Sequence, residues 1–321
     1  MWNYIVRRIL QMIPIIIGVS LIIFFIITLI PGNFIDARAQ GAHMTLEQVN
    51  HLKELYGENE PIHIKYLKWI KGAVKFDFGY SFTHQIPVSK VIDTFVWNSF
   101  TIAAIAFLLE LLIAVPIGII CATRQYSKLD YLFTVIALVG ISLPSFFLGL
   151  ILIKLFAVDL KILPLAGLDT PGTNYAGIQF LFDRLRHVIL PSFVLAFISI
   201  GAMMRYTRTA VLEIIRQDYI RTARAKGLSE KVVIYKHALR NALIPIVTLI
   251  GLSLPALFAG AIITESIFGI PGIGKIALDA VSKRDYPLLM GFSMFVAVLT
   301  LAGNLLSDIL YAIVDPRVKL K

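Results

Sequence analysis

The stretch at residues 217–248 holds side chains suited to contact with a partner protein, because it is polar and basic between two long apolar runs. Small residues within it would let a partner approach the backbone closely, and its cations would be recognised electrostatically. These candidate contact residues are Arg221, Thr222, Ala223, Arg224, Ala225, Lys226, Gly227 and Leu228. The alternative interpretation is a solvated loop that only sets the topology of the chain in a membrane.

Two short helices are expected within this stretch. Gly227 is suited to end the first helix as its C-cap residue, because glycine adopts the left-handed conformation without a steric penalty. Ser229 is suited to begin the second helix as its N-cap. The pattern therefore predicts two short helices that meet at residues 227–229.

Two carboxylates fall within apolar segments, where a charge is costly. Glu110 lies midway along the second such segment, and Glu265 lies near the outer end of the fifth. A charge at mid-bilayer costs roughly 2.5–3.5 kcal/mol or more, so such groups usually face a cavity or a partner. Glu110 is expected either to line a pathway, where it would meet a cationic group, or to form a hydrogen bond between helices. Glu265 is a second pathway candidate, although it, Lys154 and Asp308 lie close enough to span ends to reach the membrane surface.

Motifs for catalysis are missing from the sequence. The chain has no glycine-rich phosphate loop followed by Lys-Ser/Thr, no His-Glu-x-x-His and no Gly-x-Ser-x-Gly, and its six histidines lack metal-ligand spacing. We therefore expect no catalytic residue, no metal site and no cofactor in this chain, and no ATP hydrolysis by it. The single cysteine, Cys121, lies in an apolar run and is expected to be a buried, inert thiol.

Composition assigns the chain to a lipid bilayer. It is 58% hydrophobic and has a mean hydropathy of +0.80, so one water-soluble core could not bury its apolar surface. The net charge of +10 raises the question of nucleic-acid binding. Because the positive charges lie between apolar segments and form no soluble basic domain, nucleic acid is not an expected partner.

Six membrane-spanning helices are expected in an all-α membrane protein. The first follows a basic head that ends at Arg8, and no small-x-small cleavage site follows it, so it is interpreted as a retained span and not as a signal peptide. The six apolar segments are 9–30, 99–123, 131–157, 188–204, 242–267 and 287–314. The expected parts are a basic head with the first span (1–30), an outer helical insert (31–97), a five-helix core (98–314) and a tail (315–321).

Lysine and arginine predict the orientation of these spans. The segments assigned to the inside carry sixteen Lys and Arg against five acidic residues, and nine of the cations lie in the loop 205–241. The short outer loops are nearly balanced in charge. Because cations favour the cytoplasmic side, both termini and the loop 205–241 are predicted to be cytoplasmic.

The insert 31–97 is expected to form a small two-helix cap on the outer face. Thr45-Leu-Glu-Gln48 has the pattern of a capping box and opens a helix that is expected to stop at Gly57. Pro61 opens a second helix with an apolar face. The residues on that face are Ile62, Tyr66, Trp69 and Ile70. Packing onto the membrane domain is the expected role of the cap, and contact with a partner is the alternative.

The chain contains one internal repeat. Residues 138–151 align with residues 249–262 at an offset of 111, with eight of fourteen positions identical, and both segments are predicted to run outward. Each has a proline that frees the carbonyl four residues earlier, at Gly140 and Gly251. Kinked helices facing a central cavity are one interpretation, and simple close packing of helices is the other. On the first interpretation the pathway candidates of the repeat are Ser142, Pro144, Ser253 and Pro255.

The stretch 217–248 resembles the cytoplasmic coupling loop of ABC importer membrane subunits, whose pattern is Glu-Ala-Ala, three residues, Gly, nine residues and Ile-x-Leu-Pro. Gly227 fills the glycine position, whereas the Glu, the Ile and the Pro are missing. The variant present here is Tyr219-Ile-Arg-Thr-Ala-Arg-Ala-Lys-Gly227 with His237-Ala-Leu-Arg-Asn-Ala-Leu-Ile-Pro245, and it resembles the B-type permease subunits of dipeptide, oligopeptide and nickel importers. Asp77-Phe-Gly-Tyr-Ser81 and Asp315-Pro-Arg-Val318 extend the resemblance toward both ends.

The resemblance implies a type I ABC importer permease that forms half of a translocation pore in the cytoplasmic membrane of a prokaryote. The implied partners are a C-type sister permease, two cytoplasmic ATPases that bind ATP and Mg²⁺, and an extracytoplasmic substrate-binding protein. Dipeptide, longer peptide and nickel chelate remain open as cargo. A passive channel or membrane scaffold and an intramembrane hydrolase are the hypotheses of other classes.

Overall fold

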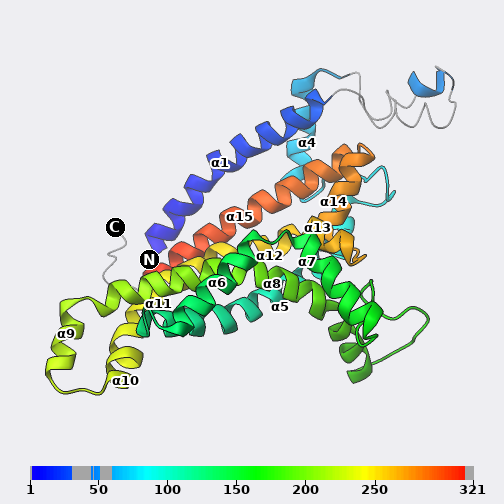
Figure 1. Cartoon of the computed structure of the whole chain (residues 1–321). Coiled ribbons are helices and arrows are strands. Elements are labelled where there is room, and N and C mark those ends of the chain that lie inside the picture. Colours follow the sequence, from blue (N-terminus) through cyan, green and yellow to red (C-terminus); the bar gives the residue numbers. More distant parts are fainter. Residues whose placement is uncertain (1, 31–44, 46, 51–59, 315–321) are drawn as a thin grey trace.

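The computed structural model describes residues 2–30, 45, 47–50 and 60–314, which are helical apart from turns and an isolated bridge between Tyr80 and Pro87. Five long helices run side by side along the molecule (Figure 1). They are α1 (Trp2–Leu29), α5 (Val88–Thr123), α8 (Ile178–Ile215), α11 (Leu239–Ser253) and α15 (Tyr286–Val314). The expected all-helical class is confirmed.

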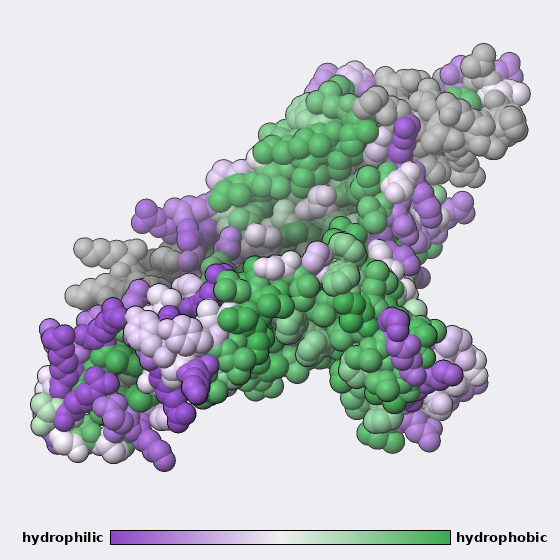
Figure 2. Space-filling model, in the orientation of Figure 1, coloured by the Kyte–Doolittle hydropathy of each residue, from purple (hydrophilic) through white to green (hydrophobic). Residues whose placement is uncertain are grey.

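The two ends of this bundle carry different elements (Figure 1). One end has the beginning of α1, the turn between α5 and α6 (Lys128–Ser142), and the protruding helices α9 (Asp218–Ala225) and α10 (Glu230–Val232); we call it the hairpin end. The other has α4 (Ile62–Ala73), α13 (Ile262–Ile267) and α14 (Ile273–Ser282); we call it the α14 end. Apolar residues cover the bundle between the two ends (Figure 2).

The helices that could cross a membrane number five in the described part of the chain, or six with a bent pair. They are Ile5–Leu29, Val88–Thr123, Ile178–Ile215, Glu230–Ile267 and Tyr286–Leu310. The bent pair joins α6 to α7 (Ser145–Leu152), which continues as the π-helix η1 (Ile153–Asp159), with a 102° bend between them. The six expected segments therefore all appear, but the third is broken.

Several expected boundaries were too narrow. Helix α5 begins at Val88 and not at 99, and α8 extends over Ile178–Ile215 instead of 188–204. The loop 205–241 is itself mostly helical, because α8 continues to Ile215 and α9, α10 and the π-helix η2 (Val233–Ala238) follow. Polar residues end an apolar run without ending a helix, since Lys, Arg and Glu are good helix formers.

The two copies of the internal repeat have different backbones. In the first copy Leu143 and Pro144 are extended, with ψ of 125° and 135°, so the chain turns sharply between α6 and α7. In the second copy Leu254 and Pro255 stay in the right-handed helical region. There the chain breaks only after α12 (Ala256–Ala259), at Gly260 with φ of +80°.

Glycines of the repeat lie where helices approach closely. A Cβ on Gly140 would come 3.0 Å from the Phe197 carbonyl oxygen on α8, and one on Gly251 would come 2.7 Å from the Ser307 Cα on α15. These two glycines therefore serve close helix packing, which was one of the two interpretations.

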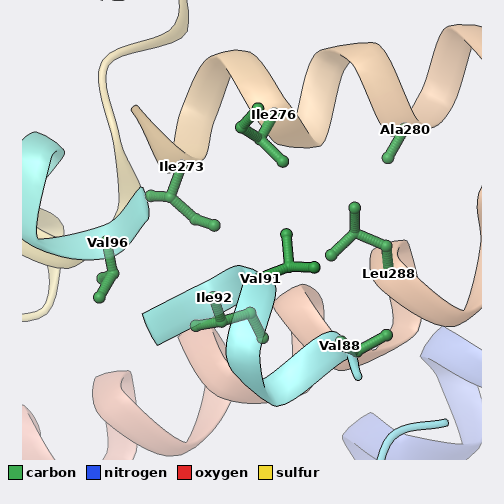
Figure 3. Packing of buried hydrophobic residues seen from close by; sticks show 8 residues of the cluster. All are labelled: Val88, Val91, Ile92, Val96, Ile273, Ile276, Ala280 and Leu288. Atoms are coloured by element: carbon green, nitrogen blue, oxygen red, sulfur yellow. The ribbon is translucent and has the colours of Figure 1, made fainter. Parts of the chain in front are cut away.

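The α14 end has its own apolar core (Figure 3). The first two turns of α5, the inner face of α14 and the start of α15 meet there. Their buried side chains are Val88, Val91, Ile92, Val96, Ile273, Ile276, Ala280 and Leu288. This core fixes α14 across the two long helices.

The described part of the insert agrees with its expected helix signals. Thr45 Oγ1 accepts from the Gln48 N–H at 3.4 Å and Gln48 Oε1 accepts from the Thr45 N–H at 3.0 Å, which is a reciprocal capping box. Helix α4 follows Pro61, and Tyr66 and Trp69 pack against Phe24 of α1. Packing onto the membrane domain is thus observed for α4. The expected helix end at Gly57, most of the insert before it and the tail 315–321 lie outside the described residues.

Candidate functional site

Helices α9 and α10 with η2 form a protruding unit, residues 218–238, which we call the basic hairpin (Figure 1). Helix α9 rests on η2 through Ile220 and Ala223, which are buried against Val233 and Ala238. This contact leaves the other face of α9 to solvent. The hairpin is thus a packed element and not a solvated loop.

Seven of the eight expected contact residues lie on the open surface of the hairpin. They are Arg221, Thr222, Arg224, Ala225, Lys226, Gly227 and Leu228. Ala223 is an exception, because its side chain is 7% exposed and faces the chain itself. An outward role for Ala223 is therefore wrong in this structure, and its size serves the close approach of α9 to η2.

The turn of the hairpin follows the prediction with a shift of one residue, because the C-cap is Lys226 and Gly227 comes directly after it. Helix α9 ends at Ala225, Gly227 has φ of +75°, and Ser229 is the N-cap of α10. Across this turn Arg224 Nε donates to Glu230 Oε1 at 2.7 Å. The ion pair ties the last turn of α9 to the first turn of α10, and a sequence pattern gave no sign of it.

The hairpin surface is largely hydrophilic (Figure 2), and several of its exposed side chains are cationic. Arg224 is paired with Glu230, and Arg221 lies 3.4 Å from Asp218. Lys226, Lys231 and Lys236 are exposed and form no ion pair with any residue that the structure describes. These three lysines are the charges most available to an acidic partner.

Glu110 is half-buried midway along α5. Its carboxyl group has no hydrogen bond or ion pair within residues 2–30, 45, 47–50 and 60–314. The alternative role, a hydrogen bond between helices, is therefore not found among the residues that the structure describes. The side chain remains available to a partner chain or a cargo.

The other pathway candidates fall into two environments. Ser142 and Pro144 are exposed at the bend between α6 and α7. Ser253 donates to the Leu249 carbonyl oxygen at 2.8 Å, and Pro255 is buried, with its ring so near Gly303 of α15 that no Cβ would fit there. The structure does not bring the two copies of the motif to one shared surface of this chain.

Glu265 does not reach the membrane surface, contrary to the expectation, because its side chain is 1% exposed. Its Oε1 accepts from the Ser99 hydroxyl at 2.6 Å and the Ala261 N–H at 2.9 Å, and its Oε2 accepts from the Lys275 N–H at 2.8 Å. The backbone of Gly272 lies directly against the carboxylate. In this environment the carboxylate holds the chain between α12 and α14 against α5.

Sequence reasoning missed three further polar contacts. Asp285 is fully buried and accepts from the Ser81 hydroxyl at 2.6 Å and the Thr83 N–H at 2.9 Å, so the Asp77–Ser81 run is fixed to the start of α15. Asp183 accepts from the Thr170 N–H and hydroxyl at 2.8 and 2.6 Å. Asp130 of α6 pairs with Arg208 of α8. The partners of Asp285 and Asp130 lie 204 and 78 positions away, and that of Asp183 lies 13 positions away, beyond the reach of a helix or turn pattern.

Comparison with known proteins gives consistent matches over the whole chain. Residues 114–320 match the family described as binding-protein-dependent transport system inner membrane component, and residues 1–106 match the N-terminal family of such membrane components. The oligopeptide transport system permease protein AppB of Bacillus subtilis is 41% identical over 98% of this chain and 99% of its own. The dipeptide transport system permease protein DppB of Escherichia coli K12 is 36% identical over 100% of both chains.

A solved structure shares the fold. The MetNI methionine ABC transporter, in inward-facing conformations, matches with a TM-score of 0.50 and 17% sequence identity, over 68% of this chain and 96% of the matched chain. At that identity the likeness concerns the fold alone. It agrees with the expected type I importer permease architecture.

Proposed function

This chain belongs to the family of binding-protein-dependent transport system inner membrane components, and from that premise we propose that it is the permease subunit of an ABC importer for peptides. It forms half of the translocation pathway in the cytoplasmic membrane. The observation that carries the proposal is the resemblance over nearly full length to permeases named for oligopeptides and dipeptides. For the same reason we prefer peptide over nickel chelate as cargo, and an importer subunit over a passive channel, scaffold or hydrolase.

The partners follow from the same premise. A pathway built from this chain needs a sister permease, two ATPases that bind ATP and Mg²⁺, and an extracytoplasmic binding protein that delivers the peptide. This chain supplies the membrane part and no ATPase site. We propose that Glu110, which is half-buried and has no hydrogen bond or ion pair in the described residues, meets the ammonium group of a peptide.

The hairpin end is proposed to face the cytoplasm, because it carries most of the lysines and arginines between the spans. A cysteine introduced at Ser229 should then react with a membrane-impermeant thiol reagent only after the cells are permeabilised. A cysteine at Lys65 in α4 should react in intact cells. Cys121 is buried and gives no background. Labelling of Ser229→Cys in intact cells would contradict the orientation.

The basic hairpin is proposed to dock on an ATPase subunit and pass its movement to the spans. Its support is the packed base formed by Ile220 and Ala223 and the exposed cationic surface. A rigid element with an open face can transmit force, whereas a solvated loop cannot.

Gly227→Val tests this docking. A β-branched residue is strongly disfavoured at φ of +75°, so the turn and everything after it would be displaced. We expect the variant to insert into the membrane but to copurify much less ATPase and to lose peptide-dependent ATPase activity. Gly172→Val is the matched control, since Gly172 has φ of +77° and open space around it, as Gly227 does, but lies outside the hairpin.

The charges of the hairpin are best tested at Lys226. Arg224→Glu is less informative, because it would also place a carboxylate beside Glu230 and open the hairpin from within. Lys226→Glu changes an exposed charge that has no ion pair in the described structure. It should weaken ATPase copurification without affecting the hairpin itself. Normal copurification by both Gly227→Val and Lys226→Glu would mean that the hairpin only sets topology.

A further inference from the structure

Helix α6 is joined to α8 by an ion pair with two parallel hydrogen bonds, in which the Asp130 carboxylate is buried and the Arg208 side chain is 26% exposed. Arg208 Nε donates to Asp130 Oδ1 at 3.0 Å, and its second guanidinium nitrogen donates to Oδ2 at 2.9 Å. The Tyr126 N–H adds a third donor at 2.9 Å, and Asp130 is 4% exposed. A two-pronged contact of this kind fixes direction as well as distance.

The ion pair lies close to the base of the basic hairpin. Arg208 is two helical turns before Ile215, where α8 ends, and α9 begins at Asp218. The last turns of α8 are packed by Val211 against Ala122 of α5 and Ala242 of α11. Movement of the hairpin therefore reaches Arg208 through a continuous, packed helix.

Helix α6 packs on α8 and, through Phe133 and Ala137, next to α5, but it buries few residues of its own. Its buried residues are Asp130, Ala137 and Gly140, and the last two face α8, where Gly201 approaches the Ala137 carbonyl oxygen and Gly140 approaches that of Phe197. Backbone-to-backbone contacts of this kind let one helix slide along the other. The ion pair at Asp130 resists sliding because it is directional and fixed at the start of the helix.

The far end of α6 is the bend at Pro144. There the chain turns by 102° into α7, with Leu143 and Pro144 extended. A displacement of α6 along its axis acts directly on this bend. The second copy of the repeat differs, because α11 is joined to the hairpin through the backbone of η2.

We propose that Asp130 and Arg208 are positioning residues that transmit displacement of the basic hairpin to α6 and to the bend at Pro144. The inference rests on the proposed coupling function of the hairpin. It assigns each copy of the repeat its own connection to the hairpin: a side-chain ion pair for the first and continuous backbone for the second. Neither residue needs to touch the cargo.

The test uses the complete transporter, with its sister permease, ATPases and binding protein, in lipid vesicles. A bimane fluorophore is attached to a cysteine introduced at Ile136, exposed on α6, or at Ala202, exposed on α8. Its emission is recorded with and without ATP and vanadate, and uptake of trialanine is measured in parallel. Asp130→Asn keeps the shape of the side chain and removes its charge.

In Asp130→Asn we expect the α8 label to respond to ATP as in the unmodified protein, the α6 label to lose its response, and uptake to fall about tenfold, within the usual range of coupling between sites. Asp308→Asn is the matched control, because it makes the same change in the Arg8–Asp308 pair, which does not involve α6. It should leave the α6 response unchanged.

A wild-type response of the α6 label in Asp130→Asn would overturn the inference. Failure of the α8 label to respond in the unmodified protein would instead overturn the coupling function itself. If Asp130→Asn does not assemble, the reversed pair Asp130→Arg with Arg208→Asp decides. Restored assembly with a restored α6 response supports the link, and restored assembly without that response rejects it.

Discussion

The two ends of the molecule hold their buried carboxylates by different chemistry. At the α14 end Glu265, Asp285 and Asp183 accept hydrogen bonds from hydroxyl groups and backbone N–H groups, and Asp183 also has a histidine 3.8 Å away. At the hairpin end the buried carboxylate of Asp130 accepts two hydrogen bonds from the Arg208 guanidinium and one from the Tyr126 N–H. Neutral donors therefore dominate at one end and an ion pair at the other.

The difference matters for motion. Backbone donors belong to the local fold, so a carboxylate held by them is released only when that fold opens, and each unsatisfied buried donor costs about 1–3 kcal/mol. An ion pair joins two side chains on separate helices, and both can move with those helices while the pair stays formed. The buried carboxylate contacts of the α14 end are thus expected to stay fixed, whereas the helices of the hairpin end can move together while their ion pair stays formed.

The largest loss of stability at the α14 end is expected from Glu265→Leu. This change leaves the Ser99 hydroxyl and the N–H groups of Ala261 and Lys275 without their acceptor, which should cost about 3 kcal/mol or more. Thermal unfolding of the detergent-purified chain measures it. Glu265→Gln is the control, because it keeps one acceptor oxygen and should cost less. Equal melting temperatures for Glu265→Leu and the unmodified protein would show that Glu265 does not stabilise the α14 end.

A smaller effect is expected from Asp285→Asn. The Ser81 hydroxyl and the Thr83 N–H both donate to Oδ2, and the Leu288 N–H donates to Oδ1 at 3.3 Å. The amide keeps an oxygen at one of these two positions and presents an NH₂ group to the donor or donors at the other, so a loss of about 1–2 kcal/mol is expected. Because the donors are neutral, the loss should be the same at low and high salt. A loss that shrinks markedly on adding salt would show that Asp285 is held by charge after all.

The smallest effect is expected from Asp308→Asn at the hairpin end. Asp308 and Arg8 pair between α15 and α1, but their side chains are 28% and 45% exposed. Partly exposed ion pairs contribute about 1 kcal/mol or less, and salt screens them. The melting temperature should fall slightly at low salt and should match the unmodified protein at high salt. A large loss of melting temperature that does not depend on salt would contradict the proposed difference between neutral hydrogen bonds at the α14 end and ion pairs at the hairpin end.

The basic hairpin was the part of the site most open to prediction from sequence. Its turn depends on local rules: Gly227 adopts positive φ directly after the C-cap residue Lys226, and Ser229 takes the N-cap position, although its side chain forms no capping hydrogen bond. The residues predicted to lie on its surface are exposed, except Ala223, which is buried. That residue faces inward because of contacts with η2, which lies later in the chain.

The repeat shows where sequence reasoning stops. Ser-Leu-Pro occurs at 142–144 and 253–255, yet Pro144 is extended and Pro255 is helical. A proline removes one N–H but does not dictate its own ψ angle, and so the surroundings decide. Pro255 is buried against Gly303 of α15, whereas Pro144 is exposed. Contacts between distant segments, such as those of Asp130 and Glu265, also could not be predicted from local sequence patterns.

Helix α8 is much longer than a membrane is thick. Its 38 residues span about 57 Å, against about 30 Å for the hydrocarbon core. Gly201 lies against the Ala137 carbonyl, and the fourteen residues from there to Ile215 form an arm of about 21 Å. A tilt of about 10° would move the tip of that arm by about 4 Å. Arg208 lies halfway along this arm. The displacement passed to α6 through Asp130 would therefore be about half of the displacement at the tip.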